Sequence, residues 1–254
     1  MRIALLSDIH GNLPALQAVV RDLDRRGVDA VVNLGDALSG PLLPLPTARF
    51  LMGQDWQHLA GNHERQVLAP GPGGRGPEDA FTHAQLTPEV LAWMAALQPS
   101  LHYSRDLYLC HATPRSDLDY LLDTVRPDGS LRAATHAELA ERLAGIDAAV
   151  VACGHTHHPR VMRSASGQLL VNPGSVGLQA YEWDRPHPHR VENGSPDARY
   201  AVVERVHGRW QAELIAVPYD HESMALLAQA RGMDDWVHAL RTGFMEGGGS
   251  AAAG

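Results

Sequence analysis

The sequence lacks the features that mark disulfide-rich, membrane-embedded or secreted proteins. Only two of its 254 residues are cysteines, Cys110 and Cys153, so no disulfide framework is predicted, and this usage is typical of a reducing compartment. No apolar run reaches the roughly 18 residues that suggest a membrane span. The first eight residues do not have the pattern of a secretory signal. We therefore expect a cytoplasmic protein without a membrane segment.

Positive charge is also scarce. The chain has 21 Lys and Arg residues against 29 Asp and Glu residues, which gives a formal net charge of −8. This balance argues against a domain-wide basic surface, and therefore against long nucleic acids as partners. A local basic pocket, or metal ions bound in an acidic cleft, could still attract a small anion.

Apolar residues are plentiful, and their spacing predicts an α/β fold. They make up 44% of the chain, which is enough to bury a sizeable core. Short apolar runs alternate with helical spacing in the first half, whereas hairpins dominate the second half. We therefore predict two sheets packed together and flanked by helices, in a single domain over 1–245. Strands are predicted at 3–6, 30–34, 56–59, 107–110 and 148–153, hairpins at 161–171 and 200–217, and helices at 13–26, 47–52, 88–97, 135–143, 221–230 and 234–241.

Five stretches show neither pattern. Residues 39–46 and 70–77 are rich in proline or glycine and are predicted to be loops. The segments 112–132 and 178–199 do not resemble core, and we expect them to be surface loops that form a rim around a substrate site. The tail at 246–254 is rich in glycine and alanine and is predicted to be disordered.

Five of the predicted strands are each followed, within a few positions, by residues that can bind metal ions. In open α/β sheets, ligands bind outside the carboxyl ends of the strands, so these strand ends would bring oxygen and nitrogen donors to one crevice. The donors are Asp8 and His10 after the first strand, Asp36 after the second, Asn62 and His63 after the third, His111 after the fourth, and His155 and His157 after the fifth.

The types and spacing of these donors favour divalent transition metals. Carboxylate and imidazole without thiolate suit manganese, iron, cobalt, nickel or zinc. Asp8 and His10 are two residues apart, as are His155 and His157, and residues two apart in extended backbone project to the same side. Neighbouring glycines such as Gly35 let the chain turn sharply beside a crowded site.

In this order, the motifs resemble those of the calcineurin-like metallophosphoesterase superfamily. The resemblance spans about 1–177. Two further stretches, 7–12 and 172–175, are similar to the small bacterial branch of that superfamily, which includes phosphodiesterases and enzymes that cleave dinucleoside polyphosphates. The motifs are Asp8-Ile9-His10, Gly35-Asp36, Gly61-Asn62-His63-Glu64, His111 and Gly154-His155-Thr156-His157.

The resemblance implies a fold, a metal centre and a mechanism. The fold would be a four-layer αββα sandwich of two mixed sheets. Two divalent ions would be bound, with manganese foremost and iron, nickel, cobalt, zinc or magnesium as alternatives, and a bridging hydroxide would attack phosphorus. His63 would bind no metal and would stabilise negative charge on the phosphate. The first ion would take Asp8, His10, Asp36 and His157, and the second Asp36, Asn62, His111 and His155, so that Asp36 bridges the two.

The expected substrate is a small phosphate ester, with phosphodiesters preferred. Phosphomonoesters, phosphoproteins and dinucleoside polyphosphates are alternatives. A non-catalytic, metal-binding scaffold is an alternative of another class, and the complete set of motif residues argues against it. The oligomeric state stays open. Candidate substrate contacts are Asn12, Arg115 and Tyr181, followed by Arg185, His189 and Asn172; His158 is a candidate neighbour of the ligands, and most other histidines, including His58, are expected at the surface.

Overall fold

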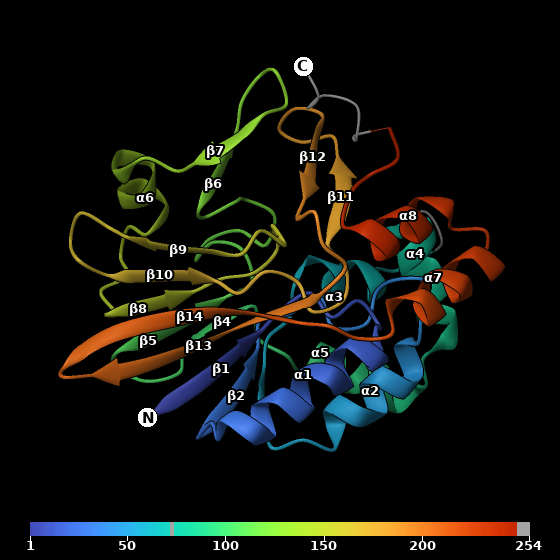
Figure 1. Ribbon diagram of the computed structural model, residues 1–254, viewed down its shortest axis with the longest axis horizontal. Helices are drawn as coiled ribbons and strands as arrows, with labels where there is room; N and C mark the ends of the chain where they lie inside the picture. Colours follow the sequence, from blue (N-terminus) through green and yellow to red (C-terminus); the bar gives the residue numbers. More distant parts are fainter. Residues whose placement is uncertain (72–73, 248–254) are drawn as a thin grey trace.

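The computed structural model describes residues 1–71 and 74–247. Two five-stranded sheets lie face to face, and helices cover their outer faces (Figure 1). The first sheet has the order β14-β13-β1-β2-β3, in which β1, β2 and β3 are parallel to one another. Its strands are β1 (Arg2–Leu6), β2 (Ala30–Asn33), β3 (Gln57–His58), β13 (Ala198–Val206) and β14 (Arg209–Val217).

The second sheet has the order β4-β5-β8-β10-β9. Its three central strands are parallel, and its two edge strands are antiparallel to their neighbours. Both sheets are therefore mixed. The strands are β4 (Ser100–His102), β5 (Leu107–Cys110), β8 (Val150–Ala152), β9 (Arg160–Arg163) and β10 (Leu169–Asn172).

Successive side chains along the strands point to opposite faces of each sheet, and this produces three apolar layers. In β1, Ile3 and Leu5 pack between the two sheets, while Ala4 and Leu6 point to the helices on the other side, because successive side chains leave a strand on opposite faces. The outer face of the second sheet packs on α6. This arrangement confirms the predicted α/β fold of two mixed sheets flanked by helices. The helices are α1 (Leu13–Arg26), α2 (Pro44–Met52), α3 (Asn62–Val67), α4 (Pro77–Gln85), α5 (Pro88–Ala95), α6 (His136–Arg142), α7 (His221–Ala230) and α8 (Asp234–Thr242).

Local signals explain where several helices begin and end. The Asn12 side chain accepts a hydrogen bond from the Ala15 amide at the start of α1, and Gly27 ends that helix with φ of 64°, as expected of an N-cap and a left-handed C-terminal residue. Thr135 and Glu138 form a capping box at α6, as the sequence predicts.

The two segments expected to be surface loops are structured, which corrects that prediction. The first contains most of the hairpin β6 (Asp123–Val125) and β7 (Leu131–Ala133), and the second contains β11 (Ala180–Trp183) and β12 (His189–Glu192). Leu121 and Leu122 are buried against α6. Their burial depends on distant parts of the chain, so local periodicity does not reveal it.

Other differences are smaller. α3 and α4 were not predicted, and Pro77, expected to end a loop, opens α4, because proline is well tolerated at the first helical position. α2 begins at Pro44, three residues early. His58 is buried beside Trp56 and Trp93, so it is not a surface residue. Residues 248–254 of the predicted disordered tail lie outside the described residues.

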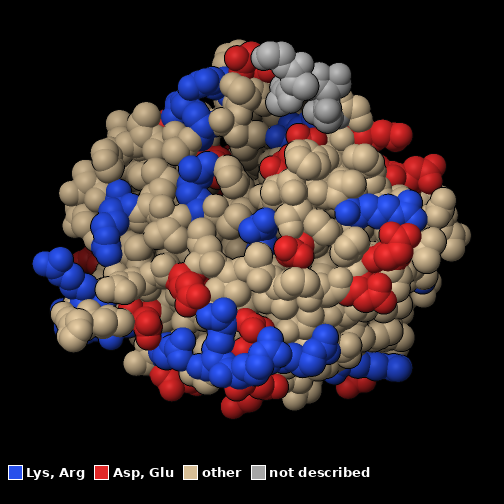
Figure 2. Space-filling model, in the orientation of Figure 1, with Lys and Arg blue, Asp and Glu red and all other residues tan. Residues whose placement is uncertain are grey.

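Charged residues of both signs are interspersed on the surface. On the face in Figure 2, basic side chains form a row along the lower edge with acidic ones above and below it, and uncharged residues cover most of the face. Among the helices that the structure describes, none combines the length and apolar character needed to span a bilayer.

Candidate metal centre

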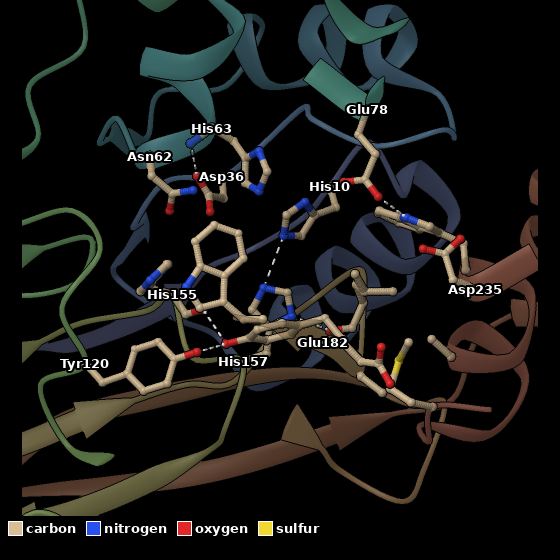
Figure 3. Close-up of a pocket in the computed structure, with 17 residues that line it drawn as sticks. His10, Asp36, Asn62, His63, Glu78, Tyr120, His155, His157, Glu182 and Asp235 are labelled. Atoms are coloured by element: carbon tan, nitrogen blue, oxygen red, sulfur yellow. Dashed lines mark hydrogen bonds between the residues drawn. The ribbon is translucent and has the colours of Figure 1, made fainter. Parts of the chain in front are cut away.

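Two groups of three side chains converge at the carboxyl ends of the strands. Within each group, one potential ligand atom from every residue lies within 4.8 Å of the others. Two members of each group, His10 with His157 and Asp36 with His155, border a cavity of about 320 Å³ (Figure 3). The first group is Asp8, His10 and His157, and the second is Asp36, His111 and His155.

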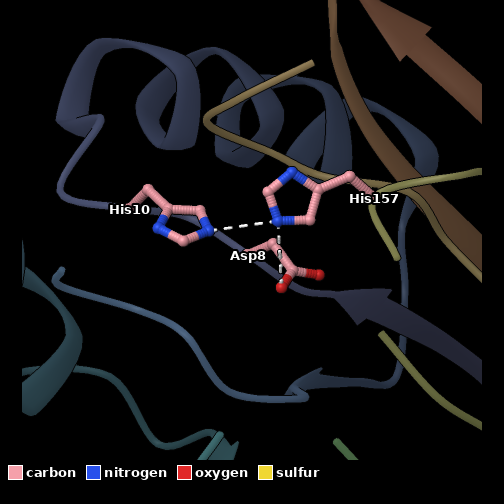
Figure 4. A group of neighbouring side chains, drawn as sticks. All are labelled: Asp8, His10 and His157. Atoms are coloured by element: carbon pink, nitrogen blue, oxygen red, sulfur yellow. Dashed lines mark hydrogen bonds and ion pairs between the residues drawn. The ribbon is translucent and has the colours of Figure 1, made fainter. Parts of the chain in front are cut away.

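The first group brings two imidazole nitrogens face to face (Figure 4). Nε2 of His10 lies 3.1 Å from Nε2 of His157, which lies 3.5 Å from Oδ1 of Asp8. Each imidazole has its Nδ1 atom 2.7 Å from a backbone carbonyl oxygen, that of Ser39 or that of Leu178. Nδ1 is therefore the donor, and the two Nε2 lone pairs point at each other. Oδ1 of Asp8 is buried without a hydrogen-bond partner, so this group fits a cation.

Backbone carbonyls also orient the imidazoles of the second group. Nδ1 of His111 donates to the Leu34 carbonyl oxygen at 2.9 Å, which leaves its Nε2 3.1 Å from Oδ2 of Asp36. His155 has the opposite orientation, because its Nε2 donates to the Leu118 carbonyl oxygen at 3.0 Å. Its Nδ1 lone pair therefore faces the group. Backbone acceptors of this kind commonly set the tautomer of metal-binding histidines.

Asn62 adds an oxygen to the second group. The Oδ1 position lies 3.0 Å from Nδ1 of His155, 3.1 Å from Nε2 of His111 and 3.2 Å from Oδ2 of Asp36. Its Nδ2 donates to Oε1 of Gln66 at 3.3 Å, which supports this orientation of the amide. An amide oxygen that faces only lone pairs is poorly placed for hydrogen bonding and well placed to share a metal ion with them.

The backbone around the two groups is strained. Asp8, His10, Asp36, His155 and His157 all have positive φ angles, between 51° and 66°. Residues other than glycine seldom adopt this region, and such strain collects at functional sites where the surrounding structure imposes it. Gly154 permits the close approach, because a Cβ atom there would overlap Ser7 and Asp8.

The protonation states suit metal ligands. Burial, assisted by neighbouring histidines, lowers the pKa of His10 to about 3 and that of His155 to about 4. Burial opposes ionisation of Asp36, but His111 and His63 outweigh it and hold the pKa of Asp36 well below its usual range. The site therefore offers neutral imidazoles and an ionised carboxylate. Burial lowers the pKa of His111, but Asp36 reverses this and raises it to about 9, so protons compete with metal there.

His63 lies on the cavity wall outside both groups. Its Nδ1 is 2.8 Å from Oδ1 of Asp79, which also accepts a hydrogen bond from Oγ of Ser39 at 2.7 Å. Burial lowers the pKa of His63, but Asp36 and Asp79 overcome that effect and raise the pKa to about 10. A protonated imidazole is thus held at the cavity. Asp79 was not predicted as a site residue, because a carboxylate in the first turn of a helix is a weak signal for this role.

Glu64 ties the loops of the centre together. It is buried, and its carboxylate accepts hydrogen bonds from the amides of Asp36, Ala37 and Gly61 at 2.7–2.8 Å. Burial and the nearby Asp36 raise the pKa of Glu64. The fourth residue of the Gly61-Asn62-His63-Glu64 motif therefore has a structural role, because it joins the end of β2 to the start of α3.

The structure brings one of the three predicted substrate contacts to the cavity. Tyr181 lines it. Asn12 does not, because its side chain caps α1 and donates to the Gly177 carbonyl and the Tyr219 hydroxyl. Arg115 also lies outside, because a turn at 113–116 carries it away from the cavity and it donates to the Glu141 carbonyl.

Other polar candidates support the loops. Asn172 donates to the Gly154 carbonyl and to the Thr156 hydroxyl, and so holds the loop that carries His155 and His157. His158 contacts Asp123. Tyr120, not predicted as a site residue, lines the cavity, and its hydroxyl lies 2.7 Å from that of Tyr181 and 2.8 Å from Nε2 of His189.

The two cysteines lie next to the ligands in sequence but do not join them. Both are buried as free thiols in the apolar layer between the second sheet and α6. The Cys110 sulfur lies near the Ala112 and Ala152 carbonyls. Burial raises the pKa of both thiols, which suits a packing role.

Comparison with known proteins agrees with this geometry. The model of the calcineurin-like phosphoesterase superfamily domain matches residues 1–188. An uncharacterised protein of Methanocaldococcus jannaschii is 25% identical over 236 residues, which cover 86% of this chain and 88% of that protein.

Among solved structures, a metallophosphoesterase from Sphaerobacter thermophilus superimposes with a TM-score of 0.74 and 24% identity, covering 96% of this chain and 100% of that one. A hypothetical protein from Pyrococcus horikoshii superimposes with a TM-score of 0.73 and 16% identity, covering 95% and 98%. At these identities the likeness shows the shared fold.

Proposed function

The chain belongs to the calcineurin-like phosphoesterase superfamily and is a metallophosphoesterase, and we propose that it hydrolyses small phosphodiesters at a centre of two divalent metal ions. The two unpaired, buried cysteines support placing it in the cytoplasm.

The observation that carries the proposal is the pair of buried groups whose lone pairs face one another. Asp8, His10 and His157 would hold one ion, and Asn62, His111 and His155 the other, with Asp36 shared between them. Nitrogen and oxygen donors without thiolate support manganese, with iron, cobalt, nickel, zinc or magnesium as alternatives. When bound, two such ions polarise phosphoryl oxygens and make water a good nucleophile near neutral pH.

The chain's own residues supply the rest of the chemistry. Because Asp79 binds Nδ1 of His63, Nε2 is the free end of that imidazole. A cationic His63 at the cavity stabilises negative charge that grows on the phosphate and can donate its Nε2 proton to the leaving oxygen. Tyr181 and Trp236 line the same cavity and exclude part of the bulk water.

The cavity lining supports diesters over the alternatives. Among the described residues, no arginine or lysine lines it, whereas a monoester dianion or a polyphosphate carries extra charge that basic side chains usually neutralise. A non-catalytic scaffold would not need His63 held by a buried carboxylate beside the two groups.

The test is hydrolysis by metal-stripped protein with single metals added back. We expect no turnover without metal, and manganese-restored turnover of bis(p-nitrophenyl) phosphate at least about tenfold faster than that of p-nitrophenyl phosphate. Turnover that survives complete metal removal would contradict the metal centre. A faster monoester reaction would contradict the diester preference and favour a phosphomonoesterase.

A further inference from the structure

The cavity has two ends of different chemistry. Figure 3 shows Asn62 and Tyr120 at one end and Glu78 and Asp235 at the other. The second end is contributed by the first turns of α4 and α8, and Trp236 completes it. None of these three residues belongs to the metal-binding motifs. We call Glu78, Asp235 and Trp236 the acidic end.

The acidic end is held in place by a specific contact. Nε1 of Trp236 donates to Oε1 of Glu78 at 2.6 Å, and the Trp236 side chain is 3% exposed. Burial raises the pKa of Glu78; the Trp236 hydrogen bond and His63 counteract this, and the Asp235 carboxylate adds to it. Two carboxyl groups thus line one cavity, and the charge of Asp235 disfavours ionisation of Glu78. A cation bound at this end would offset that repulsion.

The protein supplies little to balance this charge at the cavity. All 21 basic side chains of the chain are arginines, and none lines the cavity among the described residues. His63 lies close enough to Glu78 to lower its pKa, but it is already bound to Asp79. Of the four carboxylates at the cavity, Glu182 forms an ion pair with Arg190 at 2.6 Å.

Aromatic side chains surround the remaining space. Trp183, Tyr181 and Trp236 all line the cavity, and Trp183 is 37% exposed. Aromatic faces attract organic cations, most strongly those of tryptophan. Carboxylates and aromatic rings in one cavity therefore fit an alkylammonium group better than a neutral or anionic one.

We propose that the acidic end binds an organic cation carried by the non-reacting substituent of the substrate, so that the preferred substrate is a phosphodiester of an ammonium-bearing alcohol. The inference rests on the proposed phosphodiesterase function. Substrates with a second phosphate, such as dinucleoside polyphosphates, would place negative charge against Glu78 and Asp235 and should be poor.

A matched pair of esters tests the proposal. p-Nitrophenyl phosphorylcholine and p-nitrophenyl 3,3-dimethylbutyl phosphate share a leaving group and differ in one positive charge. With manganese-loaded protein, we expect kcat/KM for the choline ester to be about tenfold higher. Asp235→Asn should remove most of this preference. Asp234→Asn, the adjacent exposed acid outside the cavity, should retain it. Equal or faster turnover of the neutral ester would overturn the proposal while leaving the phosphodiesterase function intact.

Binding separates failure of the subsite from failure of catalysis. Calorimetric titration of manganese-loaded protein with choline should give a dissociation constant at least about fivefold lower than with 3,3-dimethylbutan-1-ol, and Asp235→Asn should abolish the difference. If neither ester were hydrolysed, the proposed phosphodiesterase function would be wrong, and the titration would still test the cation subsite. Equal dissociation constants for choline and the neutral alcohol would overturn that subsite.

A second pair of substrates distinguishes a free ester from a lipid headgroup. Hydrolysis of soluble glycerophosphocholine but not of phosphatidylcholine vesicles would identify a free ester, and the converse a lipid headgroup.

Discussion

The floor of the cavity and its rim are built from sequence in different ways. We call the seven predicted metal ligands, five of which line the cavity, the floor. The rim consists of the hairpins β6–β7 and β11–β12, the segment before β6 that carries Tyr120, and helices α4 and α8. Floor residues follow buried strands within a few positions, so neighbouring residues place them. The rim combines segments far apart in the chain, as in the contact of Trp236 with Glu78 and that of Tyr120 with His189.

The difference indicates separate roles. The floor concentrates backbone strain, opposed lone pairs and buried charge, which are features of a site built for ions and not for stability. The rim is held by ordinary hydrogen bonds and apolar contacts, and it determines the shape and charge of the space above the floor. Changes in the floor should therefore alter metal content and turnover, and changes in the rim should alter stability and substrate choice.

The largest effect is expected at Asp36. Asp36→Ala removes the carboxylate assigned to both ions, so bound metal should fall below one ion per chain and kcat/KM should fall by at least about 10³-fold. Metal analysis and diester hydrolysis measure both quantities. Asp24→Ala, at an exposed position of α1, is the control. Retention of two ions in Asp36→Ala would disprove the shared role.

His63→Ala should separate catalysis from metal binding. Loss of a general acid and charge stabiliser should lower kcat by about 10²–10⁴-fold, while metal content stays unchanged because His63 lies outside both groups. The exposed His136, changed to Ala, should leave kcat unaltered. Loss of metal together with activity would show that His63 belongs to the floor as a ligand.

A third prediction concerns a contact remote from the cavity. Asp22 accepts hydrogen bonds from the Tyr200 hydroxyl at 2.6 Å and from Arg26 and Arg25. Burial raises the pKa of Asp22, but these hydrogen bonds outweigh that effect and lower the pKa to about 2. Because the folded-state pKa lies below the ordinary value of 3.8, the stabilisation is present at neutral pH and is lost as pH falls from about 4 to about 2.

Asp22→Asn should therefore lower the free energy of unfolding at pH 7 by about 1.5 kcal/mol, with a difference from the unmodified protein that shrinks over that acidic range. Urea unfolding at several pH values measures it. Metal content and kcat should not change. A change in either would contradict the view that this contact stabilises the fold without affecting the metal centre.

The smallest effect is expected in the rim, at Tyr120. Tyr120→Phe removes the hydroxyl that links Tyr181 to His189, and it should lower the free energy of unfolding by about 0.5–1 kcal/mol and raise KM about threefold. Two bound ions should remain. Thermal unfolding and diester kinetics measure these values, and metal loss in this variant would show that the rim supports the floor directly.

The contrast also explains which features could be predicted from sequence. Asp8, Asp36, Asn62 and His111 follow apolar runs in a recognisable order, so their meeting at one edge could be inferred, although their role as ligands stays a prediction. Arg115 follows His111 equally closely, yet a tight turn sends it elsewhere. Proximity in sequence predicts position only until the backbone next changes direction.

The rim could not be inferred in this way. The helix at 234–241 was expected, but nothing in its sequence shows that Trp236 meets α4 across the cavity. Asp79, the partner of His63, lies in a helix that the glycine- and proline-rich sequence before it concealed. Tyr120, in the segment before β6, meets Tyr181 of β11 across 61 positions of the chain. The β6–β7 and β11–β12 hairpins have too few apolar residues for their strands to show a period of two.

Metal stoichiometry tests the central claim most directly. After dialysis against manganese and removal of free ions, plasma mass spectrometry should find two ions per chain in the unmodified protein. It should find one in His10→Ala, which breaks the first group, and one in His111→Ala, which breaks the second. One ion or none in the unmodified protein, or loss of both ions from each single variant, would contradict a centre built from two separable groups.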